Sequence, residues 1–173
     1  MAVLIILGNL LVAVPVFPFS PPDNPANAGQ AVAAAKGAAN PNELAHMLLQ
    51  SIQTNKFENL NALLLDDAAL TTLKKKGSED IKALLENSSA EEIKSNLRTH
   101  YQEIIQQGIS RTINWSEVEV SEARLGKGTA KNPMVQPVTI MLTDKENHPV
   151  QLLLETAKLN NRYFLFQRME LKP

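Results

Sequence analysis

The feature that most constrains the fold is a change in the spacing of apolar residues near Ile113. Before that residue, apolar side chains recur about every 3.6 positions, which is the period of an amphipathic helix. After it, apolar and polar side chains alternate, as in strands with one buried face. A run of helices followed by a run of strands indicates an α+β fold.

Polar residues predict where the helices begin and end. Residues 40–43 read Asn-Pro-Asn-Glu, which combines a capping Asn, a Pro at the first helical position and a Glu that returns the capping bond. Ser78 and Ser89 open two further helices in the same way. We expect the second helical stretch to stop in water at Asp66-Asp67 and the longest helix to end at Gly108.

Four strands are expected after the helices, at residues 117–120, 138–143, 150–154 and 163–169. Asn160-Asn161 can adopt the positive φ angles of a two-residue hairpin turn. Strands joined in this way form an antiparallel four-stranded meander, with the N-terminal helices on one face of a curved sheet. A separate helical hairpin domain packed on a small β-meander is an alternative with the same elements.

The composition of the N-terminal segment predicts a targeting signal rather than part of the folded domain. Residues 2–19 are almost entirely apolar but are interrupted by Gly and Asn and end in prolines, which suits a signal peptide better than a permanent anchor. Small residues at 26–28 predict a signal peptide of residues 1–28, a flexible tether of residues 29–39 and an α+β domain of residues 40–173. The mature protein would be exported, periplasmic or secreted, and free of the membrane. An uncleaved anchor is the alternative.

Composition disfavours several classes of function. With 17 basic and 18 acidic residues, the chain lacks the positive charge that a nucleic-acid partner requires. It has no cysteine, and its three histidines show no metal-ligand spacing, so we expect no metal and no cofactor. Asp144, Glu146 and His148 alternate in one loop, which we interpret as a solvated hairpin tip rather than a weak metal site.

The phrase FENLNALLLDDAAL after a capped first helix, and the closing stretch NNRYFLFQRMELKP, resemble the nuclear-transport-factor-two-like, or cystatin-like, α+β cone superfamily. The resemblance covers residues 40–173 and implies a conical pocket between sheet and helices. Some members of that superfamily are isomerases or dehydratases, and others bind peptides. Such a pocket would be lined by Tyr101, Trp115 and Tyr163, which we expect to contact a small apolar ligand. We also weigh Trp115 as a packing residue that joins helix and sheet.

The last two strands carry apolar side chains on both faces, which a half-solvated sheet should not. Leu153, Phe164 and Phe166 fall on the face away from the expected helices. An exposed apolar face marks an interaction site, so these residues predict a homodimer or another partner at the sheet. The alternative is that the side chains cover one another and a folded-back terminus.

We therefore expect an exported, non-catalytic domain that binds a small ligand or protein partner through a cone or its outer sheet face. No residue is assigned to catalysis. The first alternative is a small lyase or isomerase with an acid or base in the cone, for which Tyr101 is the candidate. The second is an interaction domain that keeps its N-terminal segment as a membrane anchor.

Overall fold

The computed structural model describes residues 36–127, 132–146 and 148–173. The predicted signal peptide, residues 1–28, and residues 29–35 of the predicted tether lie outside this part of the chain. Helices come first along the chain and strands follow, which confirms the α+β class. The helical elements are α1 (Pro41–Thr54), η1 (Phe57–Leu63), α2 (Asp67–Lys76), α3 (Glu79–Leu85), α4 (Ala90–Ser110) and η2 (Trp115–Glu117).

One antiparallel sheet follows, with its strands in the order β1-β2-β3-β4. The strands are β1 (Glu119–Leu125), β2 (Val135–Thr143), β3 (Pro149–Leu159) and β4 (Arg162–Leu171). The predicted four-stranded meander is thereby confirmed. Asn160 and Asn161, with φ of 50° and 59°, form the predicted two-residue turn between β3 and β4.

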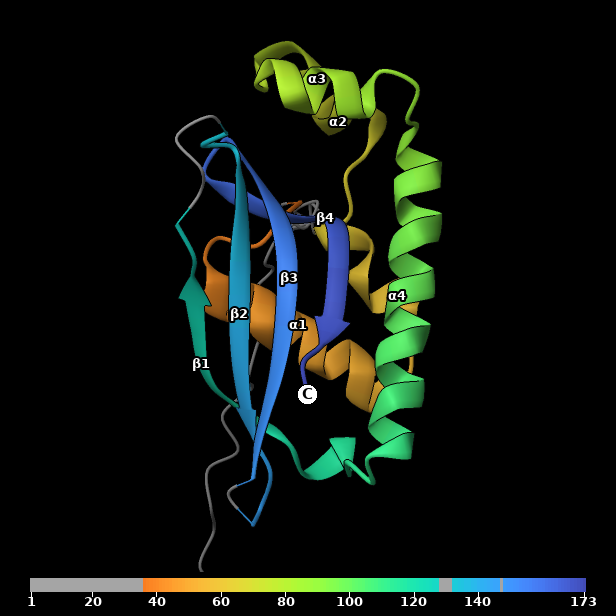
Figure 1. Cartoon of the computed structure of the whole chain (residues 1–173), viewed down its shortest axis with the longest axis vertical. Coiled ribbons are helices and arrows are strands. Elements are labelled where there is room, and N and C mark those ends of the chain that lie inside the picture. Colours follow the sequence, from red (N-terminus) through yellow and green to blue (C-terminus); the bar gives the residue numbers. More distant parts are fainter. Residues whose placement is uncertain (1–35, 128–131, 147) are drawn as a thin grey trace, which may run out of the picture. The chain divides into compact units, whose positions relative to one another are not determined.

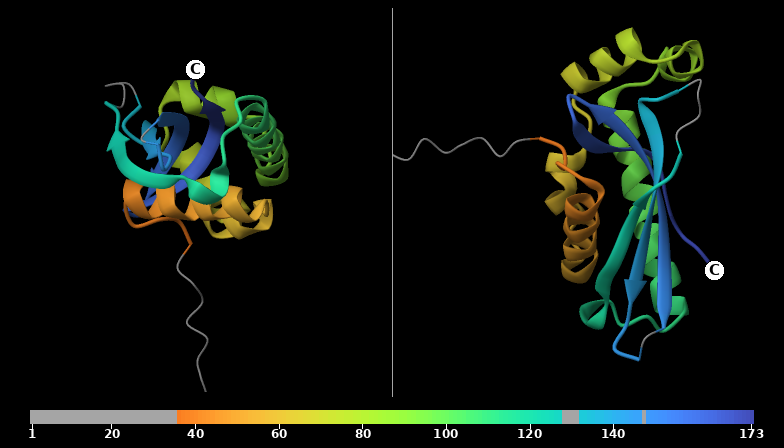
Figure 2. Two further views of the ribbon diagram at one scale, coloured as in Figure 1. Left: turned by 90° about the horizontal axis from the view of Figure 1, so that it is seen from below. Right: turned by 90° about the vertical axis from the view of Figure 1, so that its left-hand side faces the viewer.

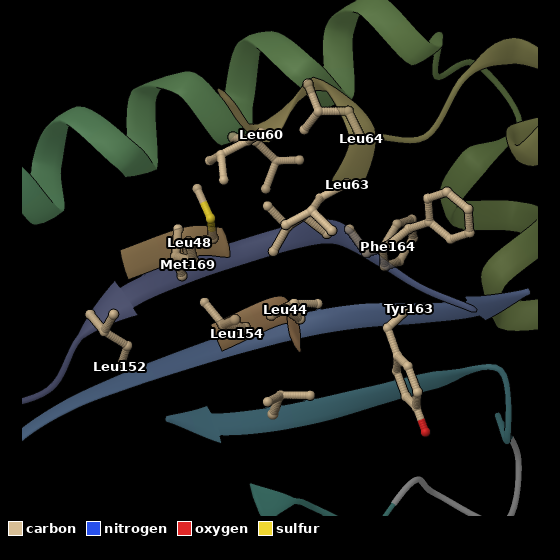
Figure 3. Packing of buried hydrophobic residues seen from close by; sticks show 14 of the residues in the cluster. Leu44, Leu48, Leu60, Leu63, Leu64, Leu152, Leu154, Tyr163, Phe164 and Met169 are labelled. Atoms are coloured by element: carbon tan, nitrogen blue, oxygen red, sulfur yellow. The ribbon is translucent and has the colours of Figure 1, made fainter. Parts of the chain in front are cut away.

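The helices cover one face of the sheet and one of its edges. Helix α1 crosses behind the strands, and α4 runs beside β4 (Figures 1 and 2). Leu44 and Leu48 of α1 lie close to Leu154 and Met169 of the sheet (Figure 3). No described helix lies over the opposite face of the sheet, which we call the outer face. The core is therefore one layer between α1, η1, α4 and the inner face.

Helix capping explains where several helices begin. The side chains of Asn40, Ser78 and Ser89 each accept a hydrogen bond from a backbone N–H three residues later, as predicted. The second helical stretch, η1, does end shortly before Asp66-Asp67, at Leu63, but Asp66 caps the start of α2 instead of ending a helix in water.

Two further boundaries near the helix–sheet junction also differ from the prediction. Gly108 lies inside α4, which continues to Ser110. The first strand begins at Glu119 rather than at residue 117, after the short helix η2, which Trp115 opens. At this junction a Cβ on Gly108 would lie 2.4 Å from Nε1 of Trp115, so the glycine leaves room for the indole.

The folded part of the chain extends back beyond Asn40. Gly37 donates a backbone hydrogen bond to the Ala62 carbonyl, and Ala38 exchanges two with Tyr163 at the edge of β4. Gly37 has a φ of 79°, and a Cβ there would lie 2.8 Å from both Arg162 and Phe164. The described end of the predicted tether, residues 36–39, is thus packed against the sheet.

Strand β4 contains a bulge. Leu154 pairs with Met169 and Thr156 pairs with Leu165, so residues 166–168 of β4 oppose Glu155 alone. Bulges bend a strand and change the direction of its side chains. This irregularity, together with the segment at residues 36–39, explains why β4 carries apolar residues on both sides.

Candidate functional site

The residues predicted to line a cone are packing residues in this structure. The hydroxyl of Tyr101 donates a hydrogen bond of 2.7 Å to the Ser51 carbonyl, and its ring meets Phe57 edge-on at 5.5 Å. Burial raises the pKa of Tyr101. This side chain therefore joins α4 to the end of α1 as a neutral hydrogen-bond donor.

Trp115 and Tyr163 occupy other places in the core. The indole of Trp115 lies against Gly108, where a Cβ would be 2.4 Å from its Nε1. Tyr163 is buried in β4 and has the Nζ of Lys158 5.3 Å from the centre of its ring. The structure does not bring these two side chains and Tyr101 around one cavity; the cavity described below is lined by other residues.

Of the three residues predicted to form a partner face, only Leu153 remains on the outer face, where it is half-buried. Phe166 is fully buried beside α4, and Phe164 is buried near α2 and residue 36. Both rings are covered by the chain's own helices and by the segment at residues 36–39. The two phenylalanine rings are therefore not exposed on the outer face for contact with a partner.

The outer face instead carries a hollow of about 300 Å³ over β2 and β3. We call it the outer hollow. Its apolar lining comes from Val135, Pro137 and Leu153, and its charged lining comes from Lys127, Glu155 and Arg168. Its size lies at the lower end of the range for small-molecule sites, and an apolar wall with a few polar groups is typical of them.

Glu155 is the distinctive group of the outer hollow. It follows the buried Leu154 and faces the β4 bulge, so its side chain shares the outer face with Leu153. Burial raises the pKa of Glu155, and the positive charge of Arg168 offsets this only in part. No described residue donates a hydrogen bond to its carboxyl group. A carboxyl group of this kind is available for an added ligand.

The two described cations that line the hollow with Glu155, Arg168 and Lys127, differ in their surroundings. The guanidinium of Arg168 is held by Glu170, with its Nε 2.8 Å from the carboxylate. Lys127 is exposed at the rim. Asn132 also lines the hollow, and its buried Oδ1 has no hydrogen-bond partner among the described residues. Among the described residues, neither the Glu155 carboxyl group nor Oδ1 of Asn132 accepts a hydrogen bond.

Sequence reasoning missed Glu155 and Asn132. A signal for Glu155 existed, because it follows Leu153 by two positions and so shares its face of the strand. Its burial was not readable from the sequence, since it depends on the β4 bulge and on Val135 and Pro137 of the neighbouring strand.

The loop of Asp144, Glu146 and His148 behaves as a turn. Asp144 accepts backbone hydrogen bonds from Glu146 and His148, and the His148 ring lies 3.1 Å from its carboxylate. These contacts lower the pKa of Asp144, with the His148 backbone bond contributing most. Within residues 36–127, 132–146 and 148–173, no group of three acidic or histidine side chains is placed to hold a metal ion.

No helix in the described part of the chain is both long enough and apolar enough to cross a membrane.

No protein-family model, curated protein sequence or solved structure shows a significant similarity to the chain. The fold and site define a small α+β domain with N-terminal helices, an open antiparallel sheet and a charged hollow on the outer face. Its resemblance to the cone superfamily stays a prediction.

Proposed function

We propose that the domain is a binding module whose outer hollow holds a ligand with one positive charge on an apolar body. The observation that carries this proposal is the half-buried carboxyl group of Glu155, which lies against an apolar wall and accepts no hydrogen bond from the described residues. This develops the expectation of ligand binding at the outer sheet face and moves the ligand away from the cone.

Burying a charged group costs free energy, and this cost favours a cation as the ligand of Glu155. A carboxylate that has lost part of its water is stabilised by an opposite charge placed beside it. Among the described residues, Arg168 is the cation that lowers the pKa of Glu155, but its guanidinium is held by Glu170 on the same strand. An ammonium or guanidinium group of a ligand would supply the missing counter-charge, and Val135, Pro137 and Leu153 would contact its apolar part.

Three probes with one apolar body and different head groups test this proposal. Calorimetric titration of the full chain should give a higher affinity for cyclohexylamine than for cyclohexanol or cyclohexanecarboxylate. The variant Glu155→Gln keeps the size of the side chain and removes its charge. We expect it to weaken amine binding by about tenfold, as for the loss of one charge-assisted contact, and to leave cyclohexanol binding unchanged.

The matched control is Glu122→Gln. Glu122 lies on β1, where it pairs with Arg124 at 2.6 Å, and it does not line the outer hollow. Its replacement should leave all three affinities unchanged. Tighter binding of the carboxylate probe would contradict the proposal and point to Lys127 and Arg168 as the ligand-binding groups. Equal affinities of wild type and Glu155→Gln for the amine would also contradict it.

Proton transfer is a second candidate function, favoured by the same carboxyl group. A raised pKa in an apolar hollow suits a general acid or base, and this moves the lyase or isomerase alternative from Tyr101 to Glu155. The same variant separates the two candidates. Glu155→Gln would abolish turnover of a neutral substrate while retaining its binding, whereas a pure binding module shows no turnover to lose.

Export and self-association complete the proposal. Export follows from residues 1–28, and the alternative of an uncleaved anchor concerns the same residues. For a homodimer at the sheet, Leu153 is the remaining surface residue of the predicted partner face. Because Leu153 also lines the outer hollow, a dimer formed there would compete with the ligand.

A further inference from the structure

Rows of neighbouring residues cross the outer face from one edge of the sheet to the other. In the first row, the strand register places side by side Arg124 of β1, Thr139 of β2, Leu153 of β3 and Glu170 of β4. The two central side chains are uncharged and half-buried, and the two end side chains carry opposite charges. Neighbouring strands lie about 4.8 Å apart, so the ends of this row are separated by about 14 Å.

A second row has the same pattern with the charges reversed. Glu122 of β1 pairs with Met141 of β2, which pairs with Gln151 of β3. Lys172, just after β4, donates its backbone N–H to the Gln151 carbonyl at 2.8 Å and completes the row. In both rows the centre is uncharged and the edges are charged, which is the usual arrangement of a protein–protein interface.

This distribution of charge is complementary to itself. Most homodimers have a two-fold axis, which brings the same surface of both copies together. An axis parallel to the strands, between β2 and β3, lays β1 of one copy over β4 of the other and each row over the same row. Arg124 then faces Glu170 of the second copy, and Glu122 faces Lys172 of the second copy. An axis across the strands, along the first row, would instead bring Arg124 to Arg124 and Glu170 to Glu170, which are contacts between like charges.

We propose that the outer face binds a second copy of this chain about the axis parallel to the strands, with the two sheets packed face to face. Thr139 and Leu153 of each copy lie over Leu153 and Thr139 of the other, and the two outer hollows meet beside them. Aligned sheets pack in this way about 10 Å apart. Burial of the apolar centre supplies affinity, and the charged ends of the rows fix the alignment.

The charges at the edges enter this interface already neutralised. Arg124 pairs with Glu122 at 2.6 Å on β1, and Glu170 accepts a hydrogen bond of 2.8 Å from Nε of Arg168 on β4. In the dimer, each β1 pair joins the β4 pair of the second copy in one network of alternating charge. This inference rests on the self-association proposed above and does not depend on a cationic ligand of Glu155.

Sedimentation velocity of the full chain and of two charge-reversed variants tests the inference. We expect the wild type to form a dimer. Arg124→Glu and Glu170→Arg should each raise the dissociation constant of the dimer by at least about tenfold, because like charges then face each other at both symmetric contacts.

An equimolar mixture of the two variants should form a heterodimer. In this mixture the reversed charge at position 124 of one chain faces the reversed charge at position 170 of the other, and the second contact keeps its native charges. Within one chain the two positions lie at opposite edges of the sheet. Recovery of the dimer therefore cannot come from a new ion pair inside one chain.

Two further variants complete the test, with circular dichroism used to confirm that each variant is folded. Thr139→Arg places a charge at the centre of the interface and should also give a monomer, which keeps the test decisive if Glu170→Arg does not fold. Lys82→Glu reverses an exposed ion pair with Glu79 on α3, so it is the matched control and should leave the dimer unchanged. None of the four substituted residues lines the outer hollow, so failure of this inference can be told apart from failure of the proposed cation site.

The inference is overturned if the wild type sediments as a monomer at its highest soluble concentration. Dimers that persist in Arg124→Glu and Thr139→Arg would place the interface on another surface. Two folded single variants that stay monomeric when mixed would show that the two copies do not meet about this axis.

Discussion

The contact between Gly108 and Trp115 shows how one residue without a side chain fixes the junction of helix and sheet. The sequence predicted Gly108 as the end of the long helix, because glycine commonly follows a last helical turn. In the structure the helix passes through Gly108, and the missing Cβ leaves room for the indole. The only tryptophan of the chain is thereby positioned by packing.

Gly108→Ala tests this interpretation because two effects oppose each other. Alanine is favoured over glycine inside a helix by about 1 kcal/mol. Its Cβ would lie 2.4 to 2.6 Å from three atoms of the rigid indole, which must then move. Overpacking of this kind costs about 1 to 3 kcal/mol. We expect a net loss of stability in chemical denaturation and a change in tryptophan fluorescence.

A gain in stability on replacing Gly108 by alanine would contradict this interpretation. If Gly108→Ala stabilised the protein and left the fluorescence unchanged, the indole would not lie against this position. Ala→Gly at exposed Ala83, in the short helix α3, is a control for helix propensity alone. It should cost no more than about 1 kcal/mol and leave the fluorescence as it is.

Among the elements, α2 shows how a helix start was mistaken for a helix end. Two adjacent acidic residues fit either interpretation from sequence, since Asp is common at caps and in turns. The structure decides between them, because the Asp66 carboxylate accepts a bond of 2.8 Å from Ala69 N–H. It also lies 2.6 Å from Lys36 in the segment that precedes α1. Long-range contacts of this kind leave no local pattern.

Asp66→Ala should lower the free energy of unfolding by about 1 kcal/mol at neutral pH, as for the loss of a helix cap. The hydrogen bond from Lys36, followed by that from Ala69, lowers the pKa of Asp66 below its usual value of 3.8. The stabilisation is therefore present above pH 3.8 and is lost as the pH falls through the lowered pKa. Chemical denaturation of the wild type and of Asp66→Ala at a series of acidic pH values measures the difference between their free energies of unfolding.

Asp67→Ala is the matched control for that experiment. Asp67 is exposed in the first turn of α2 and makes no capping bond. Its replacement should cost less than that of Asp66. Equal costs for the two variants, or a cost for Asp66→Ala that persists in strong acid, would show that the cap does not stabilise α2.

The strands show what periodicity can and cannot predict. Alternation placed Val138, Ile140 and Leu142 on the inner face correctly, and the turn residues placed the β3–β4 hairpin. Alternation could not reveal the bulge, because three residues of β4 face one residue of β3 only in the paired sheet. The bulge places Phe166 beside α4, leaves Arg168 on the outer face and leaves Glu155 beside the hollow.

For the molecule as a whole, the sequence predicted the class and order of elements but not the place of the candidate site. The expected pocket lay between helices and sheet, where Tyr101 and Tyr163 are now packed. The outer hollow lies on the opposite face, beside the β4 bulge. Its lining residues come from positions distant in sequence, and this is why no local motif indicated it.

The proposed cation site depends on the half-buried carboxyl group of Glu155, which accepts no hydrogen bond from the described residues. The most direct test is a pH titration of this group by nuclear magnetic resonance in the full chain, with Glu155→Gln used to assign its signal. The account predicts a pKa above the usual 4.5 in the free protein, and a lower pKa when cyclohexylamine is bound. A pKa at or below the usual value that the amine leaves unchanged would contradict it.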